Sequence, residues 1–187
     1  MTDDATFLVL NAVHLKRMAS AEEAAALTGI DAGEAARVLA DAAAGGTAME
    51  IDGRFMLMPE GTQAVLAGYA ARYAAQRADP AVLAWYERFE TLNAQFIQQV
   101  SEWQAGGEER AQGRLMRSVE RLARAIEELV PAIPRYGAYV RRFNDGLALI
   151  DQGRTDYIAK PTLDSVHNVW FEFHEDILSV LGRPREA

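Results

Sequence analysis

The sequence predicts a mainly α-helical protein with one short β-hairpin, divided into an N-terminal and a C-terminal domain. Along most of the chain, apolar residues recur at steps of three and four, which is the spacing of the buried face of a helix. An Asp-Gly pair at residues 52 and 53, between two short apolar runs, indicates the hairpin. All three tryptophans lie after residue 80, so an alanine-rich first part and an aromatic-rich second part are expected to form separate domains.

The composition fits a chain that forms its core without disulfides or structural metals. Of its 187 residues, 50% are hydrophobic and none is cysteine, which excludes disulfide, thiolate and cysteine–zinc chemistry. We expect a cytoplasmic protein with no membrane role, because no apolar run reaches the ~20 residues of a membrane helix. The segment that carries Asp3 and Asp4 also lacks the basic leader of a signal peptide. The net charge of -8 predicts repulsion from polyanions such as DNA.

The first domain begins with three predicted helices. Residues 6–18 cluster their apolar side chains as a helix does. Ser20 is the predicted N-cap of a second helix, whose acidic first turn suits the helix dipole and which ends near Leu27. Gly29 allows the chain to turn, Asp31 is expected to cap the third helix, and a glycine pair after residue 44 ends it.

A hairpin and a fourth helix are expected to follow. The apolar runs Met49–Ile51 and Phe55–Met58 are the predicted strands on either side of the Asp-Gly turn. Pro59 ends the second strand because it has no backbone N–H to donate, and residues 60–75 have a helical pattern again. The order of three helices, a hairpin and a helix predicts a winged helix.

The first domain also resembles a known family. The segments AEEAAALTGIDAGEAARVLADAAAGG and DGRFMLMPEGTQAVLAGY look like the helix-turn-helix and wing of MarR-type bacterial regulators, over roughly residues 5–76. The resemblance implies a winged-helix fold. The function it would bring is that of a ligand-responsive, DNA-binding transcriptional regulator, although a shared fold does not establish a shared function.

The second domain is predicted to be a four-helix bundle-like domain. The polar, proline-containing segment RADPAV, which begins at Arg77, is expected to join the two domains, so their predicted boundaries are 1–76 and 77–187. The first of its helices carries an apolar stripe from Val82 to Trp103. The four helices are expected over residues 81–103, 114–130, 136–150 and 163–181.

A second resemblance covers about residues 80–185. The segments FETLNAQFIQQVSEWQ and DSVHNVWFEFHEDILSVLGRPR are similar to a helical C-terminal segment of actinobacterial proteins, some of them winged-helix proteins and some related to pyruvate phosphate dikinase. The resemblance implies a portable module. It implies no dikinase activity, because the phosphate-handling and swivelling histidine domains of that enzyme have no counterpart in the sequence.

The charge of the first domain argues against DNA binding. A DNA-reading winged helix contacts bases with its third helix and phosphates with basic residues of the wing. The predicted third helix has one basic residue, Arg37, and Arg54 near the wing tip is the other candidate DNA contact. Residues 1–76 contain ten acidic and five basic residues, a net charge of -5. Because affinity for DNA comes largely from phosphate neutralisation, this surface suits DNA poorly.

The same surface could instead contact a protein. Winged helices also occur within multi-subunit assemblies, where the third helix packs on a partner. An alanine-rich face permits close approach there. We therefore expect a protein partner or a homodimer as the leading alternative to DNA for this domain.

The second domain contains the candidates for a small-ligand pocket. On the last predicted helix, His167 and His174 lie seven residues apart, along the edge of the apolar stripe that contains Trp170. Asn93 lies within the apolar stripe of the first helix, where a buried amide needs a hydrogen-bond partner. Either it bonds across the bundle, with His167 or His174 as a partner, or it binds a ligand. Phe171 completes the candidate pocket lining.

A metal site is not expected between these histidines. They are about 10.5 Å apart along the helix axis at 1.5 Å per residue. A shared ion with Glu87 or Glu90 is therefore disfavoured, and hydrogen-bonded histidines at the edge of the core, or histidines of a ligand pocket, are the expected alternatives.

The sequence contains no Gly-rich phosphate loop, Ser-His-Asp arrangement or HExxH motif, so we predict a protein that is not an enzyme and has no cofactor. The leading hypothesis is a non-catalytic regulatory or accessory protein that acts through protein–protein contacts, with a small ligand as a second partner of the helical domain. The alternative hypothesis is a ligand-responsive, MarR-like DNA-binding transcriptional regulator.

Overall fold

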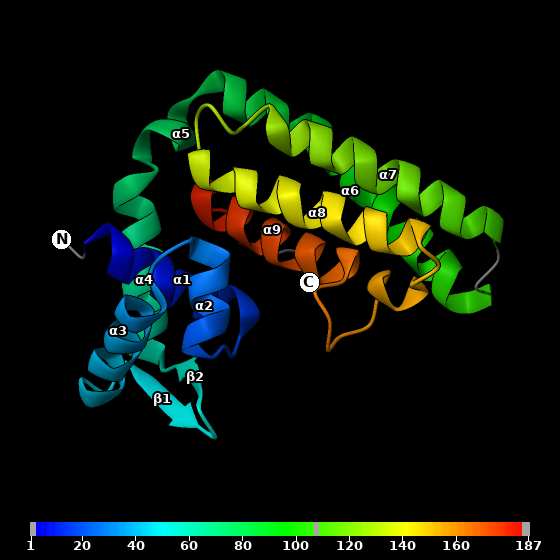
Figure 1. The fold of residues 1–187 in the computed structure, drawn as a ribbon. Helices are drawn as coiled ribbons and strands as arrows, with labels where there is room; N and C mark the ends of the chain where they lie inside the picture. The colour runs from blue at the N-terminus through cyan, green and yellow to red at the C-terminus, as the bar shows by residue number, and fades with distance from the viewer. Residues whose placement is uncertain (1–2, 107–108, 185–187) are drawn as a thin grey trace. The chain divides into compact units, whose positions relative to one another are not determined.

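The computed structural model describes residues 3–106 and 109–184, and Figure 1 shows the order of its elements. Within these residues the chain is mainly helical and contains one two-stranded antiparallel sheet, which confirms the predicted fold class at this level. The chain divides into two compact units, residues 1–75 with 175–187, and residues 76–174. In the described ranges, no helix combines the length and the apolar character needed to cross a membrane.

The first unit has the predicted order of three helices, a hairpin and a helix. Strand β1 pairs antiparallel with β2, so that Met49 faces Met56 in the register of the hairpin. The elements are α1 (Asp4–Lys16), α2 (Ala21–Thr28), α3 (Ala32–Ala44), β1 (Ala48–Ile51), β2 (Arg54–Leu57) and α4 (Pro59–Arg72).

The predicted capping and turn residues explain where these elements begin and end. The Ser20 hydroxyl accepts the Glu23 N–H at 3.2 Å while the Glu23 carboxylate accepts the Ser20 N–H at 2.8 Å, a complete capping box for α2. Asp31 caps α3 by accepting two backbone N–H groups. Asp52 and Gly53 both have positive φ angles, 50° and 76°, as the tight turn between antiparallel strands requires.

A buried polar pair lies in the core of the first unit. The Tyr69 hydroxyl donates a 2.7 Å hydrogen bond to Asn11 Oδ1, which connects α4 with α1. The Tyr69 ring also meets Phe7 edge to face, with 5.3 Å between ring centroids. Both polar groups are therefore satisfied inside an otherwise apolar core.

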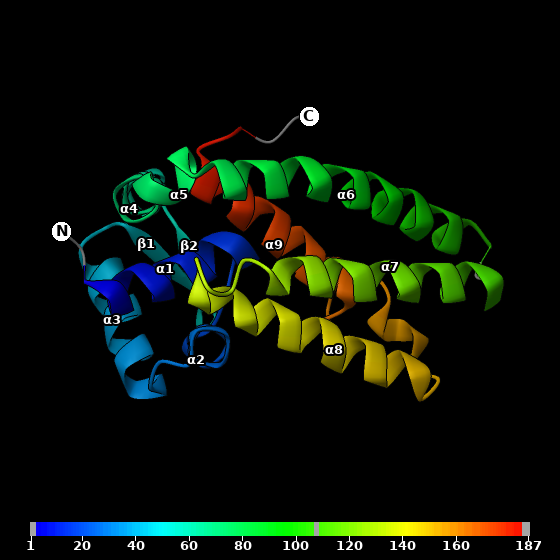
Figure 2. The ribbon, with the colours of Figure 1, turned by 90° about the horizontal axis from the view of Figure 1, so that it is seen from above.

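The second unit is built on α6, α7, α8 and the first half of α9. Helix α7 packs against both α6 and α8, and Figure 2 shows these three helices running alongside one another. Phe173 is fully buried and makes edge-to-face contacts with rings of Trp85, Phe89, Tyr136 and Tyr139. The helices are α6 (Pro80–Gly106), α7 (Glu109–Glu127), α8 (Gly137–Asp151) and α9 (Val166–Leu181), with short 3-10 turns η1 (Pro134–Tyr136) and η2 (Thr155–Tyr157).

The segment expected to be a polar joint is helical except for one residue. Helix α4 ends at Arg72, α5 (Ala74–Ala78) follows after Tyr73, and α6 begins at Pro80. Asp79 separates the two helices and accepts the Ala81 N–H at 2.8 Å. A proline in the first turn of a helix loses no hydrogen bond, so Pro80 begins a helix here.

The second unit also ends earlier than the predicted boundary of 77–187. From Glu175 onward the chain groups with the first unit, so the division falls within α9. Within the first unit, the Glu175 carboxylate lies 3.6 Å from the Arg17 guanidinium. This pairing joins residues far apart in the sequence, which local patterns do not reveal.

Candidate functional site

The two arginines predicted as DNA contacts are each held by carboxylates. On α3, the Arg37 guanidinium lies 3.8 Å from the Glu34 carboxylate and 4.0 Å from that of Asp41. Arg54, at the start of β2, donates at 2.9 Å to the Glu23 carboxylate and at 2.9 Å to a backbone carbonyl. The positive charge of both side chains is therefore partly offset before any phosphate approaches.

The rest of this surface is small or apolar. Exposed alanines follow one another at four-residue steps on α3, at positions 32, 36 and 40, and so share one face of the helix. On β1, Met49 is 41% exposed and Ile51 is 40% exposed. Because side chains two residues apart on a strand point to the same side, these two apolar groups form a common exposed surface.

Four of the five pocket candidates of the second unit contact one another. Trp170 stacks between His167 and His174 on α9, with 5.6 Å between ring centroids on each side. The Trp170 indole N–H donates to Asn93 Oδ1 at 2.8 Å, and both side chains are buried. Asn93 therefore forms a hydrogen bond between two helices, as one of the two hypotheses for this residue held. Its partner is Trp170 and not a histidine, because Trp170 lies on the apolar stripe of α9 that faces α6.

The two histidines of the stack and Phe171 have different surroundings. His174 Nε2 lies 3.9 Å from Glu90 Oε1. Burial lowers the pKa of His167 below its usual range, which favours the neutral imidazole. Phe171 is half-buried and lies about 100° around the helix from Trp170.

A partly buried ion cluster, in which Glu172 is buried and Asp164 is exposed, connects α8 with α9. The Arg142 guanidinium lies 2.7 Å from the Glu172 carboxylate and donates through Nε to Asp164 at 2.9 Å. Burial opposes the charged form, but the hydrogen bond to Asp164 and the charge of Glu172 outweigh it, and the pKa of Arg142 is raised. The cluster is well satisfied, which is what a buried charge requires.

The sequence predictions missed a concentration of positive charge on α7. Arginines recur on this helix at alternating steps of four and three, so that they share one face, and all of them are exposed. The opposite face carries the buried apolar residues that were recognised in the sequence, including Leu115, Leu122 and Ile126. The arginine face consists of Arg110, Arg114, Arg117, Arg121 and Arg124.

Three of these five arginines have no carboxylate partner in the part of the chain that the structure describes. Arg114 pairs with Glu102 at 2.9 Å, and Arg124 pairs with Glu120 at 3.3 Å. By contrast, Arg121 donates to the Ser118 hydroxyl at 2.8 Å, and none of Arg110, Arg117 and Arg121 lies within ion-pair distance of a described carboxylate.

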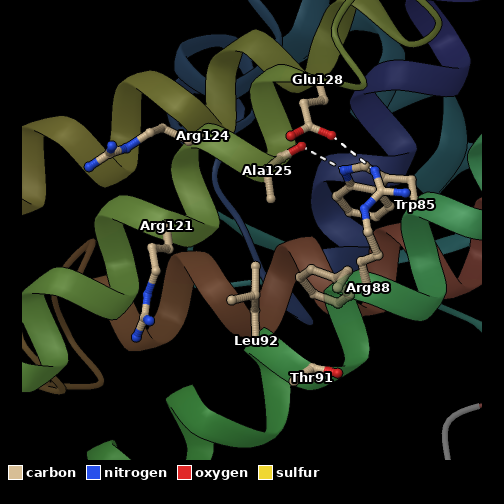
Figure 3. Close-up of a pocket in the computed structure, with 9 residues that line it drawn as sticks. Trp85, Arg88, Thr91, Leu92, Arg121, Arg124, Ala125 and Glu128 are labelled. Atoms are coloured by element: carbon tan, nitrogen blue, oxygen red, sulfur yellow. Dashed lines mark hydrogen bonds and ion pairs between the residues drawn. The ribbon is translucent and has the colours of Figure 1, made fainter.

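The arginine face borders a cavity of about 490 Å³ between α6 and α7, called the arginine groove below. Figure 3 shows Arg121 and Arg124 extending from α7, with Arg88, Leu92 and the Trp85 indole on α6. The exposed lining is mainly apolar, and Arg88, Arg121, Arg124 and Glu128 are its charged side chains. This combination of an apolar floor and a few charged groups is typical of ligand sites.

Comparison with protein-family models, curated proteins and solved structures finds no match to the chain. The assignment of a function therefore depends on the geometry of the surfaces described above.

Proposed function

We propose that this protein is a non-catalytic regulatory or accessory protein that acts through protein–protein contacts. In this proposal the first unit is a winged helix, and α3 and the hairpin contact another protein instead of DNA. The observation that carries the proposal is the pairing of Arg37 and Arg54, the two candidate DNA contacts, with carboxylates of their own unit.

Electrostatics supports this choice between the two partners. A phosphate that approached Arg37 would also approach Glu34 and Asp41, and the repulsion would offset much of the attraction. A protein partner meets no such penalty. It could cover the exposed Met49 and Ile51 side chains and approach α3 closely over its alanines.

The competing function is that of a MarR-like transcriptional regulator, and a DNA titration separates the two. The full chain is titrated against a duplex from the upstream region of its own gene and against a random duplex, at low and at moderate salt. We expect no binding to either duplex, even at low salt. Sequence-selective binding that persists at moderate salt would overturn the protein-contact proposal in favour of the regulator.

The protein contact itself can be tested by crosslinking in cells. A photoreactive amino acid is placed at Ala40 on α3 or, as a matched control, at Ala148, an exposed alanine on α8. We expect a discrete crosslinked protein from position 40 that is lost when Ala36 is changed to glutamate, and none from position 148. Equal crosslinking from both positions, or none from position 40, would contradict a contact through α3.

A further inference from the structure

We propose that the arginine groove is a binding site for a small amphipathic organic anion. The apolar part of the ligand would lie on the groove floor between α6 and α7, and its carboxylate or phosphate group would bind the Arg121 guanidinium group, with Arg124 and Arg88 as further positive charges on the lining. This inference concerns the second unit alone and does not depend on what the first unit contacts.

The floor of the groove suits an apolar ligand group. Trp85 and Phe89 stack with 5.1 Å between ring centroids and an interplanar angle of 12°. The Trp85 indole N–H is not available to a ligand, because it donates at 2.7 Å to the carbonyl of Ala125 in the last turn of α7. Leu92, the small Ala125 side chain and Thr91 also line the groove, whose surface offers mainly contacts to carbon.

The rim of the groove suits a single anionic group. Arg88 is paired with Glu128 at 3.1 Å and Arg124 with Glu120 at 3.3 Å, so both charges are partly neutralised. Among the described residues, Arg121 is paired with the Ser118 hydroxyl and with no carboxylate, which leaves most of its donors and its full charge for a ligand. A guanidinium group binds planar carboxylates and phosphates through two parallel hydrogen bonds.

The size and charge of the site favour a small anion over a polyanion. A volume of about 490 Å³ lies within the range of small-molecule sites, roughly 300 to 1,000 Å³. A long polyanion would extend beyond the groove over a protein with a net charge of -8. A small anionic ligand interacts electrostatically mainly with the nearby arginines, because charges farther away than about 10 Å are screened at ordinary salt.

Calorimetric titration of the full chain with four probes tests whether binding requires both the apolar chain and the anionic group of the ligand. Octanoate and octyl phosphate carry both an apolar chain and an anionic group, whereas octanol lacks the charge and acetate lacks the chain. We expect saturable binding of the first two at one molecule per chain, and binding at least about tenfold weaker for octanol and acetate. Octanol binding as tight as octanoate, or octanoate binding that does not saturate, would overturn the proposal.

Single substitutions locate the binding to the groove. Arg121→Ala is expected to weaken octanoate binding by about tenfold and Arg121→Lys by less, since a lysine keeps the charge but loses the paired hydrogen bonds. Arg141→Ala removes an equal charge from an exposed position on α8 and is expected to leave the affinity unchanged. Thermal melting of each variant shows whether it remains folded.

A peptide competitor separates a small-ligand site from a docking site for a protein. An acidic amphipathic helical peptide is titrated under the same conditions. If the peptide saturates the groove and octanoate does not bind, the groove belongs to a macromolecular partner and the proposal is wrong. If Arg121→Ala and Arg141→Ala weaken octanoate binding equally, the effect is one of general charge and the proposal is also wrong.

Discussion

The indole N–H of Trp170 donates a 2.8 Å hydrogen bond to Asn93 Oδ1, and each of the two side chains is 6% exposed. The pair connects α9 with the middle of α6 inside the second unit. Phe96 packs on the Trp170 ring with 5.2 Å between centroids, so the bond lies in apolar surroundings. Its two polar groups would be costly to leave unpaired, which makes the pair a determinant of how these helices align.

Replacing Asn93 with leucine is expected to destabilise the protein by about 1–3 kcal/mol, because the buried Trp170 N–H then has no acceptor. Urea denaturation followed by circular dichroism measures the change. The double variant Asn93→Leu with Trp170→Phe removes both polar groups, so its loss should be smaller than the sum of the two single losses. Strict additivity of the three measured values would show that the hydrogen bond is not what couples the two residues.

Replacing Arg142 with methionine is expected to cost about 3–5 kcal/mol, because Glu172 is 6% exposed and would keep a buried charge without its partner. The neighbouring Arg141 is exposed, and Arg141→Met should change the free energy of unfolding by no more than about 0.5 kcal/mol. Adding Glu172→Gln to Arg142→Met should recover part of the loss. Denaturant unfolding at neutral pH checks all three variants, and equal effects at positions 141 and 142 would refute the assignment.

His14 is expected to make the protein less stable in mild acid. Burial, and then the charge of Arg17, lower its pKa, although Glu175 and Asp176 act in the opposite direction. Its Nε2 is buried without a hydrogen-bond partner in the described residues. Because the unfolded chain binds the proton more readily, the contribution of His14 to stability is present above about pH 6.5 and is lost as the pH falls through the lowered pKa.

The variant His14→Gln isolates this contribution. Unfolding free energies of both proteins are measured at about pH 7.5 and about pH 5. Carboxylates and His167 contribute equally to the two proteins, so the decrease between the two pH values should be smaller for the variant. An identical decrease would mean that His14 does not titrate differently in the folded and unfolded chains.

Local chemistry made the hairpin and the helix starts predictable from the sequence. Asp52 and Gly53 adopt the positive φ angles that an Asp-Gly turn favours, and Ser20 caps α2 with the side chain and backbone groups that lie beside it in sequence. In the same way, apolar residues at steps of three and four predicted the position of α7. Signals of this kind are contained within a few consecutive residues.

The relationships that were not predicted join residues distant in the sequence. Nothing near Asn93 indicates that its partner is Trp170 and not a histidine, and nothing near Glu175 indicates Arg17. The arginines of α7 recur at steps of four and three residues in the sequence. The apolar residues of the same segment have the same spacing, and only those were interpreted, as the buried face of a helix. The meaning of the arginine face also depended on Trp85, which the fold brings to the neighbouring helix.

Two glycine substitutions test how closely α4 and α7 are each packed against their own neighbouring atoms. Gly61 in α4 is buried, and a Cβ atom there would collide with the backbone carbonyl of Thr47, so Gly61→Ala is expected to destabilise by about 1–3 kcal/mol. Gly113 in α7 would place its Cβ 3.6 Å from the flexible Arg117 guanidinium, which is an ordinary contact. Gly113→Ala should therefore stabilise by about 0.5–1 kcal/mol through helix propensity.

The comparison of these two variants separates packing from chain entropy. Both substitutions restrict the unfolded chain to a similar degree, and both place alanine in a helix, so those effects cancel in the difference between them. What remains is the contact with Thr47, whose carbonyl accepts the Met58 N–H at 3.0 Å and cannot move without losing that bond. Thermal melting should show a lower midpoint for Gly61→Ala and a higher one for Gly113→Ala. Midpoints that rise together would show that the approach of α4 to Thr47 is looser than the structure indicates.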